Sequence, residues 1–157
     1  MLRKKSLTKE QALQKLRHYC SYQERCHSEV KTKLYQLGIN KKLNDEIIAE
    51  LIQGNYLNEE RFAISFARGK FKINHWGKRK IEFALKEKFI SDYCIKKSLK
   101  QIPEKEYLGI LEKLAKEKYE SLKGEQYLIR KKKTIDYLTG RGFEWELVKD
   151  ALEDLVN

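Results

Sequence analysis

The segment between residues 68 and 80 concentrates positive charge and contains no acidic residue. Lysines and arginines that contact phosphates release bound counterions, which gives salt-dependent affinity for nucleic acid without sequence reading. Phe71 and Trp76 lie between these basic residues, and aromatic rings in such a setting stack on the bases of single strands. Alternatively, both rings pack in a junction between structural units. We favour this structural interpretation for the two rings, but we favour a binding surface for the basic residues. The basic residues of the segment are Arg68, Lys70, Lys72, Lys78, Arg79 and Lys80.

Three of these residues follow a glycine at the expected start of a helix. Gly77 precedes Lys78, and the free backbone N–H groups of a helix start favour an anion. A second basic run consists of Arg130, Lys131, Lys132 and Lys133. Consecutive residues point around most of a helix, so only about half of this run can face one ligand. A solubilising surface is the alternative interpretation of the second run.

Arg61 follows the acidic pair Glu59 and Glu60 at another expected helix start. Acidic residues at that position complement the helix dipole. Arg61 is a candidate partner-binding residue, and the alternative that we favour is an intramolecular ion pair. Phe62 is expected to pack in the core.

The charge of the chain is unevenly distributed. The net charge of +11 calls for an acidic partner. Residues 1–54 carry 11 basic and 6 acidic groups, residues 55–102 carry 12 and 5, and residues 103–157 carry 11 and 12. The basic excess therefore belongs to the first two thirds of the chain.

Residues suited to catalysis or to a metal site are scattered. The sequence lacks a GxxxxGK[ST] phosphate loop and a GxSxG elbow, and His18, His27 and His75 are isolated. Cys20 and Cys26 lie near His27, but their spacing lacks the paired ligands of a structural zinc site. We therefore expect no cofactor, no metal and no enzymatic activity. Cys20, Cys26 and Cys94 are expected to be buried, reduced thiols.

Capping residues and apolar spacing predict helices along the whole chain. Thr8 to Gln11 and Ser21 to Glu24 fit capping boxes, and Asn44 and Asn58 are expected caps of later helices. Gly38 fits the left-handed position that ends a helix. A single proline and few glycines disfavour a fold made of many tight turns.

An internal repeat organises these helices. Leu34, Leu85 and Leu138 each begin the same pattern: a turn four residues later, followed by two apolar residues spaced as on one helix face. The turn residue is Gly38 in the first copy, Phe89 in the second and Gly142 in the third. Each copy follows another helix, at about residues 8–20, 58–73 and 104–122. Three such copies predict an all-α fold of three tandem three-helix, helix-turn-helix-like repeats in an elongated, curved array. The expected boundaries are 1–54, 55–102 and 103–157.

Two stretches resemble the RecX family. Residues 54–68, with the sequence GNYLNEERFAISFAR, are similar to the family's loop and acidic helix start leading into Arg-Phe-Ala. Residues 76–81, with the sequence WGKRKI, are similar to its glycine-then-basic helix start. Ser28 to Ile39 matches the first module of the family as well. The resemblance is specific over about residues 20–100, and the third repeat departs most from the family pattern.

The resemblance implies a regulator of the RecA recombinase. RecX proteins lodge in the groove of the RecA filament on single-stranded DNA and inhibit strand exchange, ATP turnover, coprotease activity and filament extension. On this reading the partners are RecA and DNA bound without sequence preference, mainly single-stranded, with double-stranded DNA as a second possibility. The residues that we predict to bind the filament are the basic residues of the two runs, namely Arg68, Lys70, Lys72, Lys78, Arg79, Lys80, Arg130, Lys131 and Lys132.

Two other classes stay open: a sequence-specific helix-turn-helix DNA-binding protein, and a scaffold for an acidic protein. Sequence-specific readers present Arg, Asn or Gln from one recognition helix, and no helix here has a clear set of this kind. The start of the chain, residues 1–5, is charged with no apolar stretch behind it, which argues against a secretory signal. No apolar run reaches the length of a membrane span. We expect a cytosolic monomer.

Overall fold

A computed structural model describes residues 7–156 of the chain. The charged start, residues 1–5, lies outside the described part, so the expectation about a secretory signal is not addressed. Residues 7–156 form nine α-helices and no strand. In chain order the helices are α1 (Lys9–Tyr22), α2 (His27–Gln36), α3 (Lys41–Gln53), α4 (Glu59–Lys72), α5 (Lys78–Glu87), α6 (Asp92–Lys100), α7 (Glu104–Ser121), α8 (Tyr127–Gly140) and α9 (Trp145–Val156).

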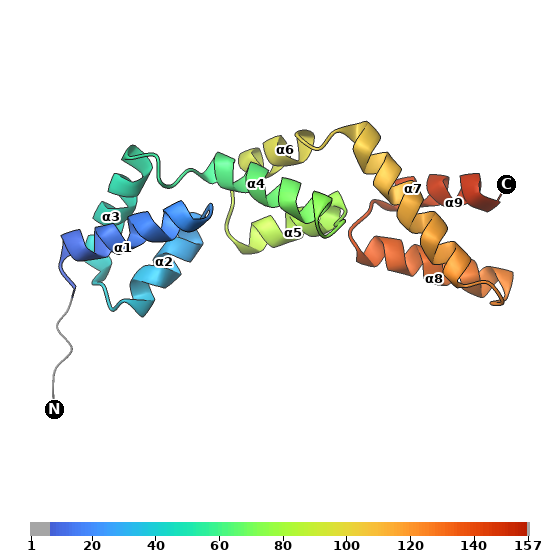
Figure 1. The fold of residues 1–157 in the computed structure, drawn as a ribbon, viewed down its shortest axis with the longest axis horizontal. Helices are drawn as coiled ribbons and strands as arrows, with labels where there is room; N and C mark the ends of the chain where they lie inside the picture. Colours follow the sequence, from blue (N-terminus) through green and yellow to red (C-terminus); the bar gives the residue numbers. More distant parts are fainter. Residues whose placement is uncertain (1–6, 157) are drawn as a thin grey trace, which may run out of the picture.

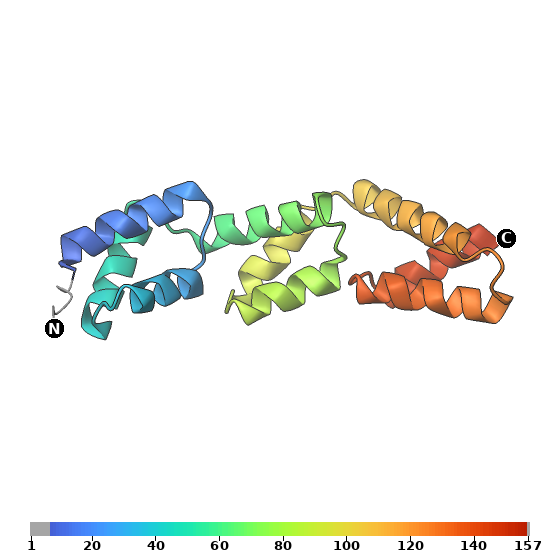
Figure 2. The ribbon, with the colours of Figure 1, turned by 60° about the horizontal axis from the view of Figure 1, so that its bottom comes forward.

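Three consecutive helices pack into each of three modules, which follow one another along an extended array (Figure 1). We call α1–α3 the first module, α4–α6 the second and α7–α9 the third. In Figure 2, α1, α4 and α7 lie along the upper edge of the array, and α2, α5 and α8 lie along the lower edge. The all-helical fold of tandem three-helix repeats is confirmed.

The end of the second helix has the same geometry in every module. Gly38, Phe89 and Gly142 have positive φ angles of 71°, 62° and 98°. In each case the next backbone N–H donates to the carbonyl of the anchor leucine, at 3.1, 3.1 and 3.2 Å. This is the hydrogen bond of a Schellman motif, which turns the chain sharply after a helix. The sequence repeat therefore corresponds to a repeat of structure.

The buried side chains form two clusters. One lies within the first module and contains Leu13, Leu16, Leu34 and Leu51. The other is continuous across the second and third modules, from Phe62 to Leu152, and also includes Cys26. The last two modules consequently share one core.

Helix starts agree with the sequence at some positions and differ at others. Thr8 forms the expected capping box with Gln11, and the Asn58 side chain caps α4 by accepting from the N–H of Arg61 at 2.9 Å. The prediction at Ser21 was wrong, because α1 continues to Tyr22 and α2 begins after Cys26. The prediction at Asn44 was also wrong, because α3 begins earlier and its cap is Asn40.

Candidate functional site

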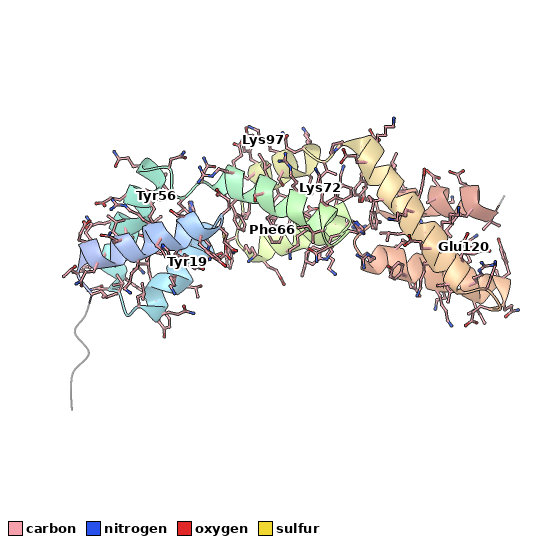
Figure 3. All side chains as sticks on the ribbon, viewed as in Figure 1. Tyr19, Tyr56, Phe66, Lys72, Lys97 and Glu120 are labelled. Carbon is pink, nitrogen blue, oxygen red and sulfur yellow. The ribbon has the colours of Figure 1, made fainter. Side chains whose placement is uncertain are left out.

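Helix α4 places Arg68 and Lys72 on its outer face. Its inner face buries Phe62, Ala63, Ala67 and Phe71, whose spacing places them on one side of the helix. Arg68 and Lys72 are four residues apart, so their side chains leave the helix on the same side. Both side chains are exposed. Figure 3 labels Lys72 on α4 and Lys97 on the neighbouring helix α6, whose side chain pairs with Glu60 at the opposite end of α4.

An open groove of about 690 Å³ runs along this face of α4. Ile64, Ile73 and Gly69 supply its apolar lining; the Ile73 side chain is 81% exposed, and nothing lies within 4 Å of where a Gly69 Cβ would be. Arg68 and Lys72 also line the groove. This surface combines apolar lining with two cations.

The other charged groups of this groove are neutralised within the protein. Arg61 pairs with Glu24 at 2.7 Å, and Glu60 pairs with Lys97 at 2.7 Å. The latter contact raises the pKa of the Lys97 ammonium. No ion pair in the described part of the chain involves Arg68 or Lys72. The groove therefore presents a net charge of two positive groups to a ligand.

Lys70 lies on a different side of α4. Two residues along a helix correspond to a rotation of about 200°, so Lys70 points away from Arg68. Its ammonium is 4.8 Å from the centre of the Trp76 ring, and the Lys80 ammonium is 4.5 Å from the same ring. Trp76 is half-buried against the core shared by the last two modules. The structure thus divides the six basic residues of segment 68–80 between separate surfaces.

The start of α5 is a contact with the third module. The N–H of Gly77 donates to the Arg141 carbonyl at 2.8 Å, and the N–H of Arg79 donates to the Gly142 carbonyl at 2.9 Å. The N–H of Lys78 donates to the Tyr107 hydroxyl at 3.0 Å. The expectation of an anion at this helix start is therefore wrong for these three donors. The side chains of Arg79 and Lys80 remain exposed, while Lys78 extends over the Tyr107 ring at 4.8 Å.

The second basic run lies at the start of α8 and is largely used within the third module. The Arg130 guanidinium lies over the Tyr119 ring at 3.6 Å and donates to the Tyr119 carbonyl at 2.7 Å. Lys133 pairs with Glu125 at 2.7 Å. Lys131 is half-buried and Lys132 is exposed. From Lys132 to the contact with α5, α8 extends over a distance on the order of 15 Å, so the run forms a separate surface.

Arg61 holds the second module against the first. Besides its pair with Glu24, the guanidinium donates to the side-chain and backbone oxygens of Asn55, at 3.1 and 3.0 Å. The favoured intramolecular ion pair is present. A contact between Arg61 and a partner stays a prediction.

The aromatic residues of segment 68–80 are structural in part. Phe71 is 2% exposed, and its ring centre is 5.7 Å from that of Tyr107 in the third module.

Sequence reasoning gave no role to Phe89, whose side chain is 85% exposed. The available signal was the repeat itself, because Phe89 occupies the position of Gly38 and Gly142.

Cys20, Cys26 and Cys94 are buried and unpaired, as expected. Burial raises the pKa of the Cys20 and Cys26 thiols. Within residues 7–156 no group of three or more His, Cys, Asp or Glu side chains is arranged to hold a metal ion. Among the described helices, none has the length and apolar character needed to cross a membrane.

Two family models match the chain. A model described as RecX, second three-helix domain, matches residues 58–99, and one described as RecX, third three-helix domain, matches residues 104–152. Together they cover more than half of the 157 residues.

Curated relatives and solved structures agree with these matches. The regulatory protein RecX of Bacillus cytotoxicus is 27% identical over 137 residues, and that of Bacillus mycoides is 26% identical over the same length. These alignments cover 87% of this chain and 51% of each relative, so the chain spans about half the length of these relatives. The crystal structure of RecX from Lactobacillus salivarius is similar in fold, with a TM-score of 0.85 at 24% identity, covering 94% of this chain and 96% of that one.

Proposed function

This chain belongs to the RecX family, and from that premise we propose that it restrains the RecA recombinase by binding along RecA filaments on single-stranded DNA. Bound there, it would inhibit strand exchange, ATP turnover, coprotease activity and filament extension. It acts by occupying an interface and catalyses no reaction itself. Its place of action is the cytosol, where RecA and DNA meet.

The groove on α4 is the observation that supports this proposal most directly. Within the described part of the chain, Arg68 and Lys72 are its two cations without an ion pair, and Ile64 and Ile73 line the groove on either side of them along the chain. Phosphates at the two cations and apolar contact with bases or sugars would hold a strand without reading its sequence. Arg79 and Lys80, exposed at the start of α5, and Lys132 on α8 extend the contact along the array. The remaining predicted residues contribute less directly, because Lys70, Lys78, Lys131 and Arg130 are partly buried against the protein.

Single-strand-dependent ATP turnover by RecA from the same source, titrated with this protein, tests the proposal. We expect the wild-type protein to suppress turnover at ratios up to about one per RecA subunit. The double variant Arg68→Ala with Lys72→Ala should need at least about tenfold more protein for the same effect. The double variant Lys113→Ala with Lys116→Ala is the matched control, since it removes two exposed lysines from α7 of the near-neutral third module.

Salt dependence separates phosphate contacts from other losses. Each phosphate contact on a single strand contributes about 0.7 to the slope of log affinity against log salt, so losing two should reduce that slope by about 1.4. The control pair should leave the slope unchanged. Unchanged ATP turnover across the whole titration with folded wild-type protein would overturn the RecA assignment, and a search for a specific DNA site would follow.

A further inference from the structure

One residue of the second module departs from the repeat at a position where the backbone favours glycine. Gly38 and Gly142 end the second helices of the first and third modules with φ angles of 71° and 98°. Phe89 occupies the same position after α5 with a φ of 62° and the same hydrogen bond from the next residue. L side chains rarely adopt this left-handed conformation, which glycine adopts freely.

Packing of the Phe89 ring does not offset this strain. Its side chain is 85% exposed, while Ile90 beside it is buried and supplies the core contact of the turn. The sister modules also bury the residue after the turn or pack it against their cores, as Phe143 and Ile39 show. The fold thus uses the turn and the residue after it, and leaves the phenylalanine ring in solvent. A strained and exposed side chain of this kind indicates a function outside the fold.

Two hollows lie beside the Phe89 ring, with volumes of about 530 and 380 Å³. Both are lined by Phe89 together with Ser28, Thr32 and Lys88, so the ring stands where α2 meets the end of α5. Their charged lining consists of three lysines and three glutamates: Lys31, Lys33, Lys88, Glu29, Glu59 and Glu87. The lining of the two hollows therefore carries no net formal charge.

Several of these charges are already satisfied. Lys88 lies 3.8 Å from Glu29, and Glu59 accepts a hydrogen bond from the N–H of Ser91 at 2.7 Å. Phosphates would find little attraction here, in contrast to the α4 groove with its two unmatched cations. A single exposed aromatic ring inside a polar, neutral rim is instead the anatomy of a protein–protein hot spot.

We propose that Phe89 is the anchor by which the second module docks on a RecA subunit, inserting its ring into an apolar pocket of that subunit. The hollows on both sides accept the polar rim of the pocket. This inference rests on the proposed function and deepens it, because it assigns protein contact to the end of α5 and strand contact to the outer face of α4.

The test compares Phe89→Gly with Phe83→Ala. Phe83 is a matched control because it is a phenylalanine on α5 that is 63% exposed and lines neither hollow. Phe89→Gly should unfold at or above the wild-type temperature, since glycine relieves the left-handed strain. It should bind an oligothymidine strand with wild-type affinity in the absence of RecA. Its inhibition of RecA ATP turnover should weaken at least about tenfold, as for loss of a hot-spot side chain.

A second variant distinguishes a pocket from a stacking surface. Phe89→Leu keeps an apolar side chain without an aromatic face, so it should retain part of the inhibition that Phe89→Gly loses. The inference is overturned if Phe89→Gly inhibits like the wild type, or if Phe83→Ala loses as much. Parallel loss of oligothymidine binding in Phe89→Gly and Phe89→Leu would also overturn it, in favour of base stacking. A wild-type protein without effect on RecA would instead refute the proposed function, before any variant is compared.

Discussion

The two joints between modules are built from different interactions. Between the first and second modules, polar contacts dominate: Arg61 with Glu24, Lys88 with Glu29, and the Ser28 hydroxyl donating to the Lys88 carbonyl at 3.0 Å. Cys26 is the residue of the first module that joins the core of the second. Ion pairs at partly exposed positions are weak and are screened by salt.

The joint between the second and third modules is tight and apolar. Gly77 and Gly142 bring two backbones so close that a Cβ on Gly77 would lie 2.2 Å from the Gly142 carbonyl carbon. Tyr107 lies between Phe71 and Phe143, with ring centres 5.7 and 5.3 Å apart. Its hydroxyl accepts from the N–H of Lys78 and donates to the Glu144 carboxylate. This joint depends on shape and on buried hydrogen bonds.

The difference assigns separate mechanical roles to the modules. The second and third form one body, because their buried side chains belong to one cluster. The first has its own core and is attached mainly by charged groups near the surface. An array built this way can adjust the first module on a partner while the basic α4 and α5 surfaces stay fixed relative to the third.

The largest expected effect is a break of the tight joint by one methyl group. Gly77→Ala places a Cβ within 2.4 Å of three backbone atoms of Gly142 and Phe143, which cannot move independently of their turn. We expect a loss of about 3 kcal/mol in the free energy of unfolding, measured by urea titration. Gly109→Ala in α7 is the control, since nothing lies within 4 Å of its Cβ and alanine favours a helix interior. A small loss in Gly77→Ala would show that the modules separate easily at this joint.

The next effect tests the buried hydroxyl of the same joint. Tyr107→Phe leaves the N–H of Lys78 and the carboxylate of Glu144 without their shared partner, so we expect a loss of about 2 kcal/mol at neutral pH. Burial, and then the hydrogen bond to Glu144, raise the pKa of Tyr107 above its ordinary value of 10.0. The folded protein therefore keeps this proton where the unfolded chain releases it.

Stability should accordingly be retained below pH 10 and fall as pH rises above it, by about 1.4 kcal/mol at pH 11 from Tyr107 alone. Burial also raises the pKa of the Cys20 and Cys26 thiols above their ordinary value of 9.0. These two thiols therefore add to the loss of stability, and their contribution begins at a lower pH than that of Tyr107. Urea titrations of wild type and Tyr107→Phe at pH 8 measure the loss of the Tyr107 hydrogen bonds. The same titrations at pH 11 measure how much of the fall in stability is due to the Tyr107 proton. A pH dependence that is identical in the two proteins would contradict the role of the Tyr107 proton.

The repeat and its turns were predictable from the sequence, because they depend on local spacing. Leucine anchors, the glycines at positions 38 and 142, and the Asn58 cap each act within about a turn of their own residue. The misplaced start at Ser21 has a tertiary cause. Cys26 is fully buried in the core of the second module, and its N–H donates to Glu29 at 3.0 Å, so the helix begins there instead.

The candidate site was predictable in composition but not in arrangement. The residue types of segment 68–80 indicated a basic surface, and the helical repeat separates Lys70 from Arg68. Contacts between distant parts of the chain decided the rest. The N–H groups at the start of α5 donate hydrogen bonds to residues 107, 141 and 142. The other charged residues of the α4 groove, Arg61 and Glu60, are paired with Glu24 and Lys97. No local pattern contains those partners.

The smallest expected effect concerns the polar joint. A double-mutant cycle of Arg61→Ala and Glu24→Ala should give a coupling of about 0.5–1 kcal/mol in low salt, decreasing in 1 M NaCl as the charges are screened. Lys97→Ala with Glu60→Ala is the matched cycle, because that pair has the same 2.7 Å distance but lies within the second module. Both cycles are measured by urea titration at two salt concentrations.

Small-angle scattering then separates attachment from stability. Arg61→Ala should broaden the distribution of distances by letting the first module pivot, whereas Lys97→Ala should leave it unchanged. If both variants scatter like the wild type, then Cys26 and the Ser28 hydrogen bond suffice to hold the first module, and the polar joint is as fixed as the apolar one. If Arg61→Ala alone broadens it, the ion pair sets the angle at which the first module meets the rest of the array.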